Sequence, residues 1–249
     1  MIIESRDNKL IKYAKKLQDR DFSQKEGKTL VESPKIIKEL CDMGLTETVM
    51  VSADAKFDHK GKFDSVTISS SVAKYLSQTE TTTGVFAIAT IPKYDVNFQH
   101  IDKFLILDNI QDPNNLGSIM RSAVAFGYET ILCINCTYAY SSKVARCSMG
   151  NNFKCKVVKT TYDDIAKLSK EIKCDIICCD MNGKSIENSR PNKDKFGIII
   201  GNEGNGVADE LRKISTMTIA IPMMGGVESL NASVSAGIIM YNLNRVKGE

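Results

Sequence analysis

The sequence predicts an α/β protein in two parts, a small N-terminal α/β unit and a larger C-terminal unit organised around a doubly wound parallel sheet. Short continuous apolar runs, such as FLILD at 104–108 and FGIII at 196–200, are typical of strands that are covered on both faces. These runs alternate with helical patterns, which favours parallel connections. Polar loops follow three of the expected strands, at the carboxyl edge where such sheets bind ligands.

Length and composition allow a substantial core and argue against a membrane protein. The chain has 249 residues, 43% of them hydrophobic, and its net charge of +3 neither requires nor excludes a nucleic-acid partner. The N-terminus turns polar at once, and no apolar run approaches the roughly 20 residues that span a bilayer, so we expect no signal peptide, no membrane partner and a cytoplasmic location. Eight cysteines and only two histidines indicate free thiols and no metal site.

Residues 1–95 are expected to form the N-terminal unit. Asn8 is the expected cap of a helix that extends to about Arg20, and basic side chains repeat along it at steps of three and four. This stripe is either a solvated helix face or a contact for a nucleic-acid phosphate backbone, and its members are Lys9, Lys12, Lys16 and Arg20. The remaining expected elements are strands at 28–33, 47–53 and 84–90, a helix at 34–44, and a strand with a Ser-capped helix within 64–78.

A stretch of mixed polarity separates the two units, and we place the linker at 96–102 and the second domain at 103–249. In that domain a helix is expected to begin near Ser118 and to end at Gly127, which suits a left-handed cap. A second basic cluster includes Lys143 and Arg146, candidate contacts for a phosphate backbone. The other expected elements are strands at 104–108, 130–135, 174–183, 196–200 and 218–223, and helices at 163–173, 207–214 and 231–246.

The loop GNEGNG at 201–206 resembles a dinucleotide fingerprint but does not match it. Its glycines follow the pattern G-x-x-G-x-G rather than G-x-G-x-x-G, which makes a nicotinamide enzyme a remote alternative. Glu203 occupies the place where a pyrophosphate would lie, and two anions repel there. A tight turn needs glycine but no acid, so this loop favours a neutral or cationic ligand.

Two further features lie near the expected ligand edge. In SLNASV, Ser229 or Asn231 either caps the last helix or acts in a reaction, and the apolar face of that helix is a core or dimer contact. Arg121 follows Ser118 by three residues on an otherwise apolar helix. It is therefore either an ordinary surface residue or a guanidinium that holds a phosphate near the mouth of the first loop.

Three segments together resemble a known family. Residues 114–127, NNLGSIMRSAVAFG, resemble the first motif of the SpoU/TrmH family of RNA ribose 2′-O-methyltransferases, and 201–206 and 221–234 resemble the second and third. Their order and spacing also agree, and SSKVARCSMG resembles a Lys-x-x-Arg-x-Ser-x-Gly string of the family. The resemblance covers about residues 103–245. More weakly, residues 1–95 resemble the family's ribosomal-protein-like substrate-binding domain.

The resemblance implies a SPOUT-type α/β domain with a deep trefoil knot, active as a homodimer. It implies S-adenosylmethionine as cofactor and a ribose 2′-hydroxyl of RNA as acceptor, with 23S ribosomal RNA favoured by the extra N-terminal domain. The implied catalytic residues are Arg121, Asn114, Glu203, Ser229 and Asn231. The implied cofactor-binding residues are Gly201, Asn202, Glu203, Gly204, Gly206, Ile221, Pro222, Met223 and Leu230. Because guanidinium keeps its proton, we expect Arg121 to hold the target phosphate and stabilise the alkoxide.

Two alternatives stay open beside this hypothesis. One keeps the chemistry and takes transfer RNA as substrate, and the other is an RNA-binding module of the same fold that has lost catalysis. The chain also departs from the family pattern, with Thr-Thr-Thr-Gly at 81–84 where many relatives have Pro-Gln-Gly, and with Ser235 where alanine is frequent. The first departure suggests a different substrate loop, and neither affects the three motifs.

Overall fold

The structure, a computed structural model, describes residues 2–94, 97–202, 204–224 and 229–244. The chain divides into two compact units, the first formed by residues 1–93 and 140–153 and the second by 94–139 and 154–249. Both are α/β, which confirms the expected fold class. In the described ranges, no helix combines the length and the apolar character that crossing a bilayer requires.

Unit 1 is built around a five-stranded sheet in the order β1-β4-β3-β5-β2. The pairs β1–β4 and β4–β3 are parallel, whereas β3–β5 and β5–β2 are antiparallel. Helices α1 and α4 pack their apolar side chains on this sheet, where Ile11, Leu76 and Phe86 are buried. The bounds are β1 Ile2–Ile3, α1 Lys9–Lys16, α2 Arg20–Glu26, β2 Lys28–Glu32, α3 Pro34–Asp42, β3 Thr46–Ser52, β4 Asp64–Ile68, α4 Ser70–Leu76 and β5 Val85–Thr90.

A segment from the middle of the chain completes unit 1. It contains α6 (Ser142–Cys147) and the 3-10 helix η2 (Asn151–Phe153), and α6 packs against β2. The buried hydroxyl of Thr29 on β2 donates to the Tyr140 carbonyl at 2.8 Å. The core of unit 1 is therefore discontinuous in sequence, which a boundary drawn from local composition does not capture.

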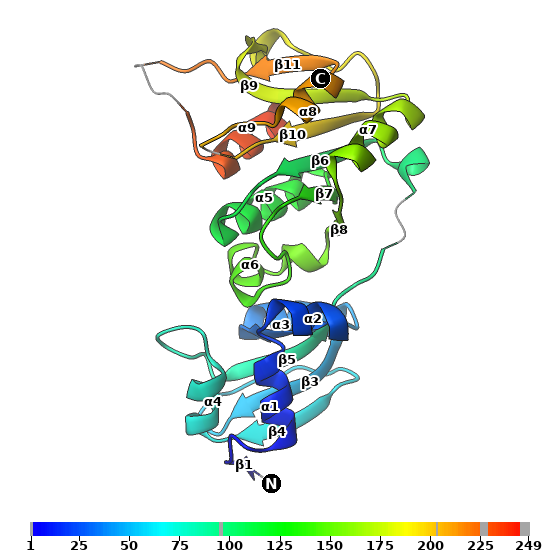
Figure 1. The fold of residues 1–249 in the computed structure, drawn as a ribbon. Coiled ribbons are helices and arrows are strands. Elements are labelled where there is room, and N and C mark those ends of the chain that lie inside the picture. The colour runs from blue at the N-terminus through cyan, green and yellow to red at the C-terminus, as the bar shows by residue number, and fades with distance from the viewer. Residues whose placement is uncertain (1, 95–96, 203, 225–228, 245–249) are drawn as a thin grey trace. The chain divides into compact units, whose positions relative to one another are not determined.

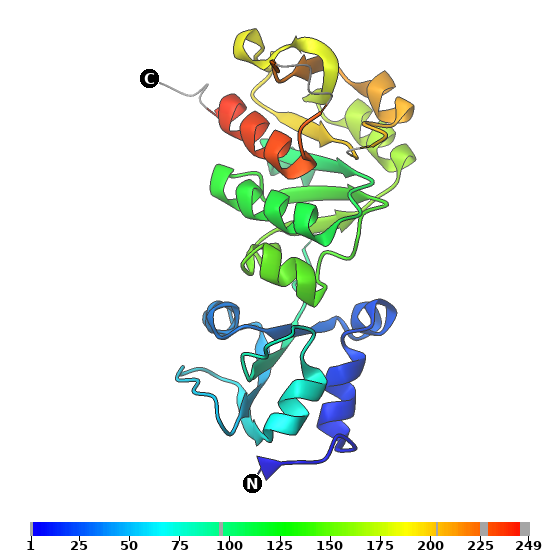
Figure 2. The same ribbon diagram turned by 90° about the vertical axis from the view of Figure 1, so that its left-hand side faces the viewer.

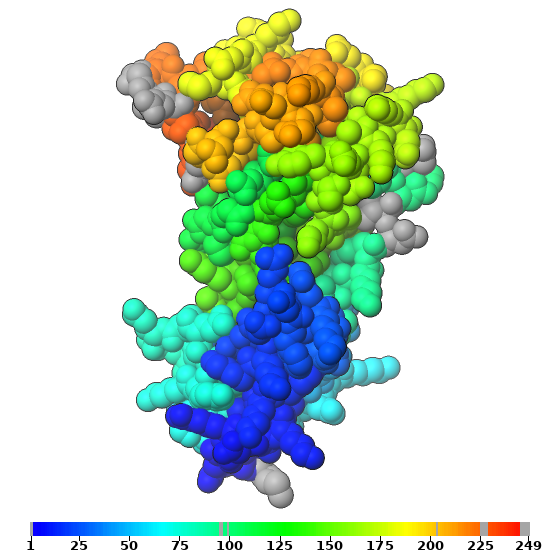
Figure 3. Space-filling view, in the orientation of Figure 1, coloured from blue at the N-terminus to red at the C-terminus, as the bar shows by residue number. Residues whose placement is uncertain are grey.

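The helix that was expected to run from Asn8 to about Arg20 is shorter than predicted, and a second helix that was not predicted follows it. Asn8 caps α1 as predicted, but α1 ends at Lys16. Asp19 then caps α2 by accepting a hydrogen bond from the Phe22 N–H at 2.9 Å. This second cap starts a new helix at Arg20. Both helices contribute to the surface of unit 1 in the space-filling view (Figure 3).

A buried carboxylate organises the loop after α4. Glu32, at the end of β2, is only 4% exposed. It accepts hydrogen bonds from the hydroxyls of Ser77 and Thr82 and from the Thr83 N–H, at 2.8–3.1 Å. The loop whose Thr-Thr-Thr-Gly sequence departs from the family pattern is therefore held by specific contacts.

Unit 2 contains a six-stranded sheet in the order β11-β9-β10-β6-β7-β8, and every pair is parallel. This confirms the predicted parallel sheet. Helices α5 and α9 lie side by side on one face, and α7 and α8 cover the other (Figures 1 and 2). The bounds are η1 Phe98–His100, β6 Lys103–Asp108, α5 Pro113–Phe126, β7 Thr130–Ile134, β8 Lys156–Lys159, α7 Tyr162–Glu171, β9 Asp175–Ser185, η3 Ile186–Asn188, β10 Phe196–Ile200, α8 Asp209–Ile214, β11 Met217–Ala220 and α9 Ala232–Asn244.

The first helix of unit 2 begins earlier than expected. It starts at Pro113 rather than near Ser118, with Asp112 accepting from the Asn114 N–H at 2.9 Å as the cap. Aspartate followed by proline is a helix-start signal. The N–H at the first helical position has no partner within the helix, so proline, which lacks this N–H, loses no hydrogen bond there. The predicted end is confirmed, because Gly127 has a left-handed φ of 75°. This early start places both asparagines of the first motif in the first turn of α5.

The chain path between the last elements is unusual. It leaves β11 at one edge of the sheet and returns as α9 beside α5, which precedes it by more than a hundred residues. The trefoil knot that the family resemblance implies is compatible with this path and stays a prediction.

We predict that Glu32→Ala lowers the free energy of unfolding of unit 1 by about 1–3 kcal/mol, because two hydroxyls and one N–H lose a buried acceptor. Urea denaturation of the full chain would measure it. Glu80→Ala, an exposed acid of the same loop, is the control and should change stability by less than about 0.5 kcal/mol. Equal effects of the two substitutions would contradict the organising role of Glu32.

Candidate functional site

The polar loops of unit 2 converge at the carboxyl edge of its sheet. They follow β6, β10 and β11, and β9 lies between β10 and β11. Here the structure encloses a cavity of about 590 Å³. Its walls come from segments within 179–181, 200–206, 219–223 and 229–239. The cavity is therefore a composite of four segments that the strand order brings together.

The loop after β10 is folded tightly on itself. The backbones of Asn202 and Gly206 exchange two hydrogen bonds, of 3.0 and 2.9 Å. The Asn202 side-chain oxygen accepts from the Gly204 and Asn205 N–H groups at 2.8 and 3.3 Å, and its amide donates to the Asn109 carbonyl at 3.0 Å. One asparagine thus shapes the loop and ties it to the loop after β6.

Two glycines of this loop are required by the backbone. Gly206 has a φ of 68°, which disfavours other residues. At Gly201, a Cβ atom would lie 2.4 Å from the carbonyl carbon and oxygen of Gly206. Both glycines therefore serve a closed turn.

A buried carboxylate holds the end of this loop. Asp108, the last residue of β6, is 2% exposed. It accepts from the Ala208 N–H at 2.8 Å and from the Tyr162 hydroxyl at 2.9 Å. Ala208 is the N-cap of α8 and has no side-chain acceptor, and Asp108 fixes this helix start by binding the N–H of Ala208 itself. Burial and the bond to Asp108 raise the pKa of Tyr162 to about 12.

The third motif is anchored to the first through two asparagines. The Asn231 side-chain oxygen accepts from the Ser233 and Val234 N–H groups at 3.0 and 3.3 Å, so Asn231 caps α9. Its amide donates to the side-chain oxygen of Asn115 at 2.9 Å. Asn115 is buried in the first turn of α5. This pair ties the start of α9 to the start of α5.

The first motif also presents polar groups to solvent. Arg121 is exposed on α5, and no hydrogen bond or ion pair joins it to another residue of the described chain. Asn114 is exposed, and its side chain donates to Asp112 at 2.8 Å. The family resemblance implies a catalytic role for Asn114 but none for its neighbour Asn115. The Asp-Pro helix start was the signal that could have placed Asn115 on the inward side of the first turn.

The structure gathers most of the predicted cofactor residues on one cavity, together with Ser229. Pro222 is absent from the described lining, and Glu203 lies outside the described residues. Asn114, Arg121 and Asn231 do not belong to the described lining either. The predicted residues that line the cavity are Gly201, Asn202, Gly204, Gly206, Ile221, Met223, Leu230 and Ser229.

A fourth segment of the cavity was not expected from the sequence. Cys179, Asp180 and Met181 on β9 line the cavity beside the loop after β10. Burial favours the neutral form of Asp180 and acts to raise its pKa. The hydrogen bond from the Asn182 N–H and the ion pair with Arg212 favour the carboxylate, and together they bring the pKa of Asp180 below its usual range. The sequence signal for this segment is Asp180, an acid near the turn that ends the strand expected at 174–183. Elsewhere, the described residues contain no group of three or more His, Cys, Asp and Glu side chains that could hold a metal.

Comparison with known proteins identifies the family. The model of the SpoU rRNA Methylase family matches residues 102–241, which is more than half of the chain. This chain belongs to the SpoU rRNA methylase family. Residues 8–87 match a second model, the MRM3-like substrate binding domain. The family resemblance drawn from the three motifs is thereby confirmed.

Relatives of this SpoU chain match it over its whole length. It is 27% identical to the 23S rRNA (guanosine(2553)-2'-O)-methyltransferase RlmP of Bacillus subtilis (strain 168), over 97% of this chain and 98% of that protein. The AdoMet-bound rRNA methyltransferase from Sinorhizobium meliloti has a TM-score of 0.87 at 19% identity, with 100% and 99% coverage. The SpoU methyltransferase AviRb from Streptomyces viridochromogenes, in complex with AdoMet, has a TM-score of 0.85 at 21% identity, with 97% and 100% coverage. At these identities the two structures show a shared fold.

We predict that Asp108→Ala lowers the free energy of unfolding of unit 2 by about 2–4 kcal/mol, because a buried N–H and a hydroxyl lose their acceptor. Tyr162→Phe removes one of the two bonds and should lower it by only about 1 kcal/mol. Chemical denaturation followed by circular dichroism would measure both. The control is Asp163→Ala, an exposed acid at the start of α7, and a control as destabilised as Asp108→Ala would refute the anchoring role.

Proposed function

We propose that this SpoU-family chain transfers a methyl group from S-adenosylmethionine to the 2′-hydroxyl of a ribose in ribosomal RNA. The observation that carries the proposal is the cavity in which the second and third family motifs meet. The full-length similarity to a 23S rRNA 2′-O-methyltransferase supports ribosomal RNA over transfer RNA as substrate. The same similarity favours an active enzyme over an RNA-binding module that has lost catalysis. A ribosomal RNA substrate is in turn consistent with the cytoplasmic location that we propose.

The residues of the cavity fit the cofactor. A volume of about 590 Å³ suits a small-molecule site, and the walls combine apolar side chains with backbone groups of the loop after β10. Asp180 is the one charged side chain of the described lining, and its negative charge suits a sulfonium ligand. When bound there, S-adenosylmethionine supplies the activated methyl group.

Arg121 is the residue that we assign to the target nucleotide. Because it makes no ion pair with the described chain, its guanidinium is available for a bidentate contact with a phosphate. It keeps its proton, so it stabilises negative charge on the attacking oxygen rather than accepting the proton. Asn114, exposed about two turns earlier on α5, helps to orient the target. Ser229 and Asn231 shape the pocket, and the catalytic role expected for Glu203 stays a prediction because this residue lies outside the described residues.

Basic residues of unit 1 supply affinity for the RNA backbone. Lys9, Lys12 and Lys16 on α1, and Arg20 at the start of α2, are all exposed. Lys143 on α6 is exposed, and Arg146 donates to the Ser142 hydroxyl at 2.8 Å. We assign RNA binding to residues 1–95 together with the segment 140–153 that completes unit 1, the linker to 96–102, and catalysis to the rest of 103–249. The match of 8–87 to a substrate-binding domain supports the first assignment.

A second copy of the chain fits the outer face of α9. This helix buries Ala236, Ile239 and Met240 but leaves Val234 50%, Ile238 38% and Tyr241 54% exposed. These three residues recur at steps of four and three, so they form one apolar stripe on the helix. We propose that the stripe packs against a partner subunit, which makes the active form a homodimer.

We predict that Arg121→Ala lowers the rate of methyl transfer to ribosomal RNA by about 100-fold or more, because charge stabilisation and phosphate binding are both lost. Affinity for S-adenosylmethionine, measured by calorimetry, should stay unchanged, since Arg121 does not line the cavity. Arg121→Lys keeps the charge without the fork and should have intermediate activity. Near-normal activity of Arg121→Ala would sink the assignment.

We predict that Ile238→Asp shifts the chain from dimer to monomer in analytical ultracentrifugation, because a carboxylate cannot be buried unpaired in an apolar contact. Met43→Asp is a matched control, since Met43 is 39% exposed and lies in unit 1. A wild-type chain that is monomeric at micromolar concentration, or a dimer unaffected by Ile238→Asp, would contradict the proposed interface.

A further inference from the structure

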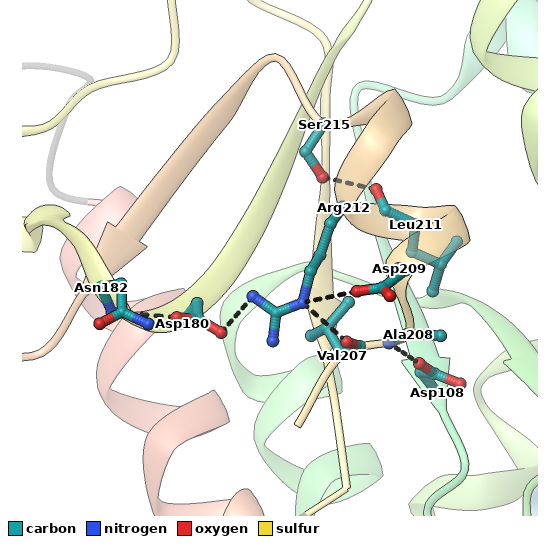
Figure 4. Close-up of polar contacts among 9 residues, drawn as sticks. All are labelled: Asp108, Asp180, Asn182, Val207, Ala208, Asp209, Leu211, Arg212 and Ser215. Carbon is teal, nitrogen blue, oxygen red and sulfur yellow. Dashed lines mark hydrogen bonds and ion pairs between the residues drawn. The ribbon is translucent and has the colours of Figure 1, made fainter. Parts of the chain in front are cut away.

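One arginine contacts two different walls of the cavity. Arg212, on α8, forms an ion pair through its Nη1 with Oδ2 of Asp180 on β9 (Figure 4). Its Nε donates to the carbonyl of Val207 at 2.9 Å, at the end of the loop after β10. Asp180 and Gly206 both line the cavity, whereas Arg212 does not belong to the described lining. The guanidinium therefore connects β9 to this loop from outside the lining.

The bridge is specific to the inner acid. The Asp180 side chain is 9% exposed, and its Oδ1 also accepts from the Asn182 N–H at 2.9 Å. A second acid, Asp209, lies 4.0 Å from the same arginine but is 86% exposed. Exposed pairs contribute little because water screens them, whereas a buried carboxylate that loses its partner is left with an uncompensated charge. The contact with Asp180 is therefore the one that fixes the arginine.

The arginine also contacts the loop itself. A Cβ atom on Gly206 would lie 3.3 Å from Nη2 of Arg212, so the guanidinium packs closely against the turn that closes the loop. Asn202 fixes the start of this loop and Asp108 fixes the residue after Val207. The Val207 carbonyl is the point at which the loop is tied to β9.

We propose that Arg212 is a positioning residue for the cofactor, which holds the 201–207 loop against Asp180 in the conformation that receives S-adenosylmethionine. This inference rests on the proposed function for the identity of the ligand. It assigns a role to a helix outside the three family motifs. Arg212 acts through the loop and through Asp180, because it does not itself belong to the described lining.

The test is calorimetric titration of the full-length chain with S-adenosylmethionine. We expect Arg212→Met to weaken binding about tenfold, and Arg212→Lys, which keeps the charge but not the fork, to weaken it less. The KM for the cofactor should rise while kcat at saturating cofactor changes little, since the loop is repositioned by binding. Asp209→Asn and Lys213→Met, on the same helix, are matched controls that should bind like the wild type.

Asp180→Asn separates positioning from direct recognition. If Asp180 acts with Arg212 as one unit, the double variant Asp180→Asn/Arg212→Met has the same affinity for S-adenosylmethionine as the single variant whose affinity is lower. Fully additive losses, or an Arg212→Met chain with lower thermal stability and unchanged affinity, would overturn the inference and leave the proposed function intact. A wild-type chain that binds no S-adenosylmethionine would instead overturn the proposed function.

Discussion

The buried carboxylate of Asp108, at the end of one of the two central strands of unit 2, is the contact on which the site depends. A buried carboxylate requires donors, and here they come from the start of α8 and from Tyr162 on α7. The loop after β10 is thereby fixed at its end, while Asn202 fixes its beginning. The backbone groups that line the cavity are positioned before any ligand arrives, which lowers the entropic cost of binding.

The same device organises unit 1. Glu32 also ends a strand, is buried, and accepts hydrogen bonds from the loop that follows α4. In both units a buried carboxylate accepts hydrogen bonds from loop N–H and hydroxyl groups that have no acceptor in the backbone of an irregular loop. The outward residues are arranged differently: Arg121 and the lysines of α1 are exposed, where they can contact a phosphate backbone. Buried acids thus shape the loops, whereas the exposed bases are the residues that we propose for RNA binding.

Local sequence patterns predicted much of this arrangement. The alternation of apolar runs and helical patterns predicted the parallel sheet, and the glycine spacing of GNEGNG argued against a dinucleotide site. The motif order led to the correct family, and most of the predicted cofactor residues line the cavity. The errors were local as well. Helix α5 starts at the Asp-Pro signal at 112–113, about a turn before the expected start, and α1 ends four residues before the expected Arg20, where Asp19 caps a second helix, α2, that was not predicted.

The sequence by itself determined the fold class, the family motifs and the glycines that the loop requires, because these depend on residues close together in the chain. Only the tertiary structure decided which distant residues meet. The sheet order inserts β9 between β10 and β11, so Asp180 reaches the cavity and pairs with Arg212. The packing of α9 on α5 selects Asn115 as the partner of Asn231. Such pairings depend on strand order and helix rotation, which no local pattern encodes.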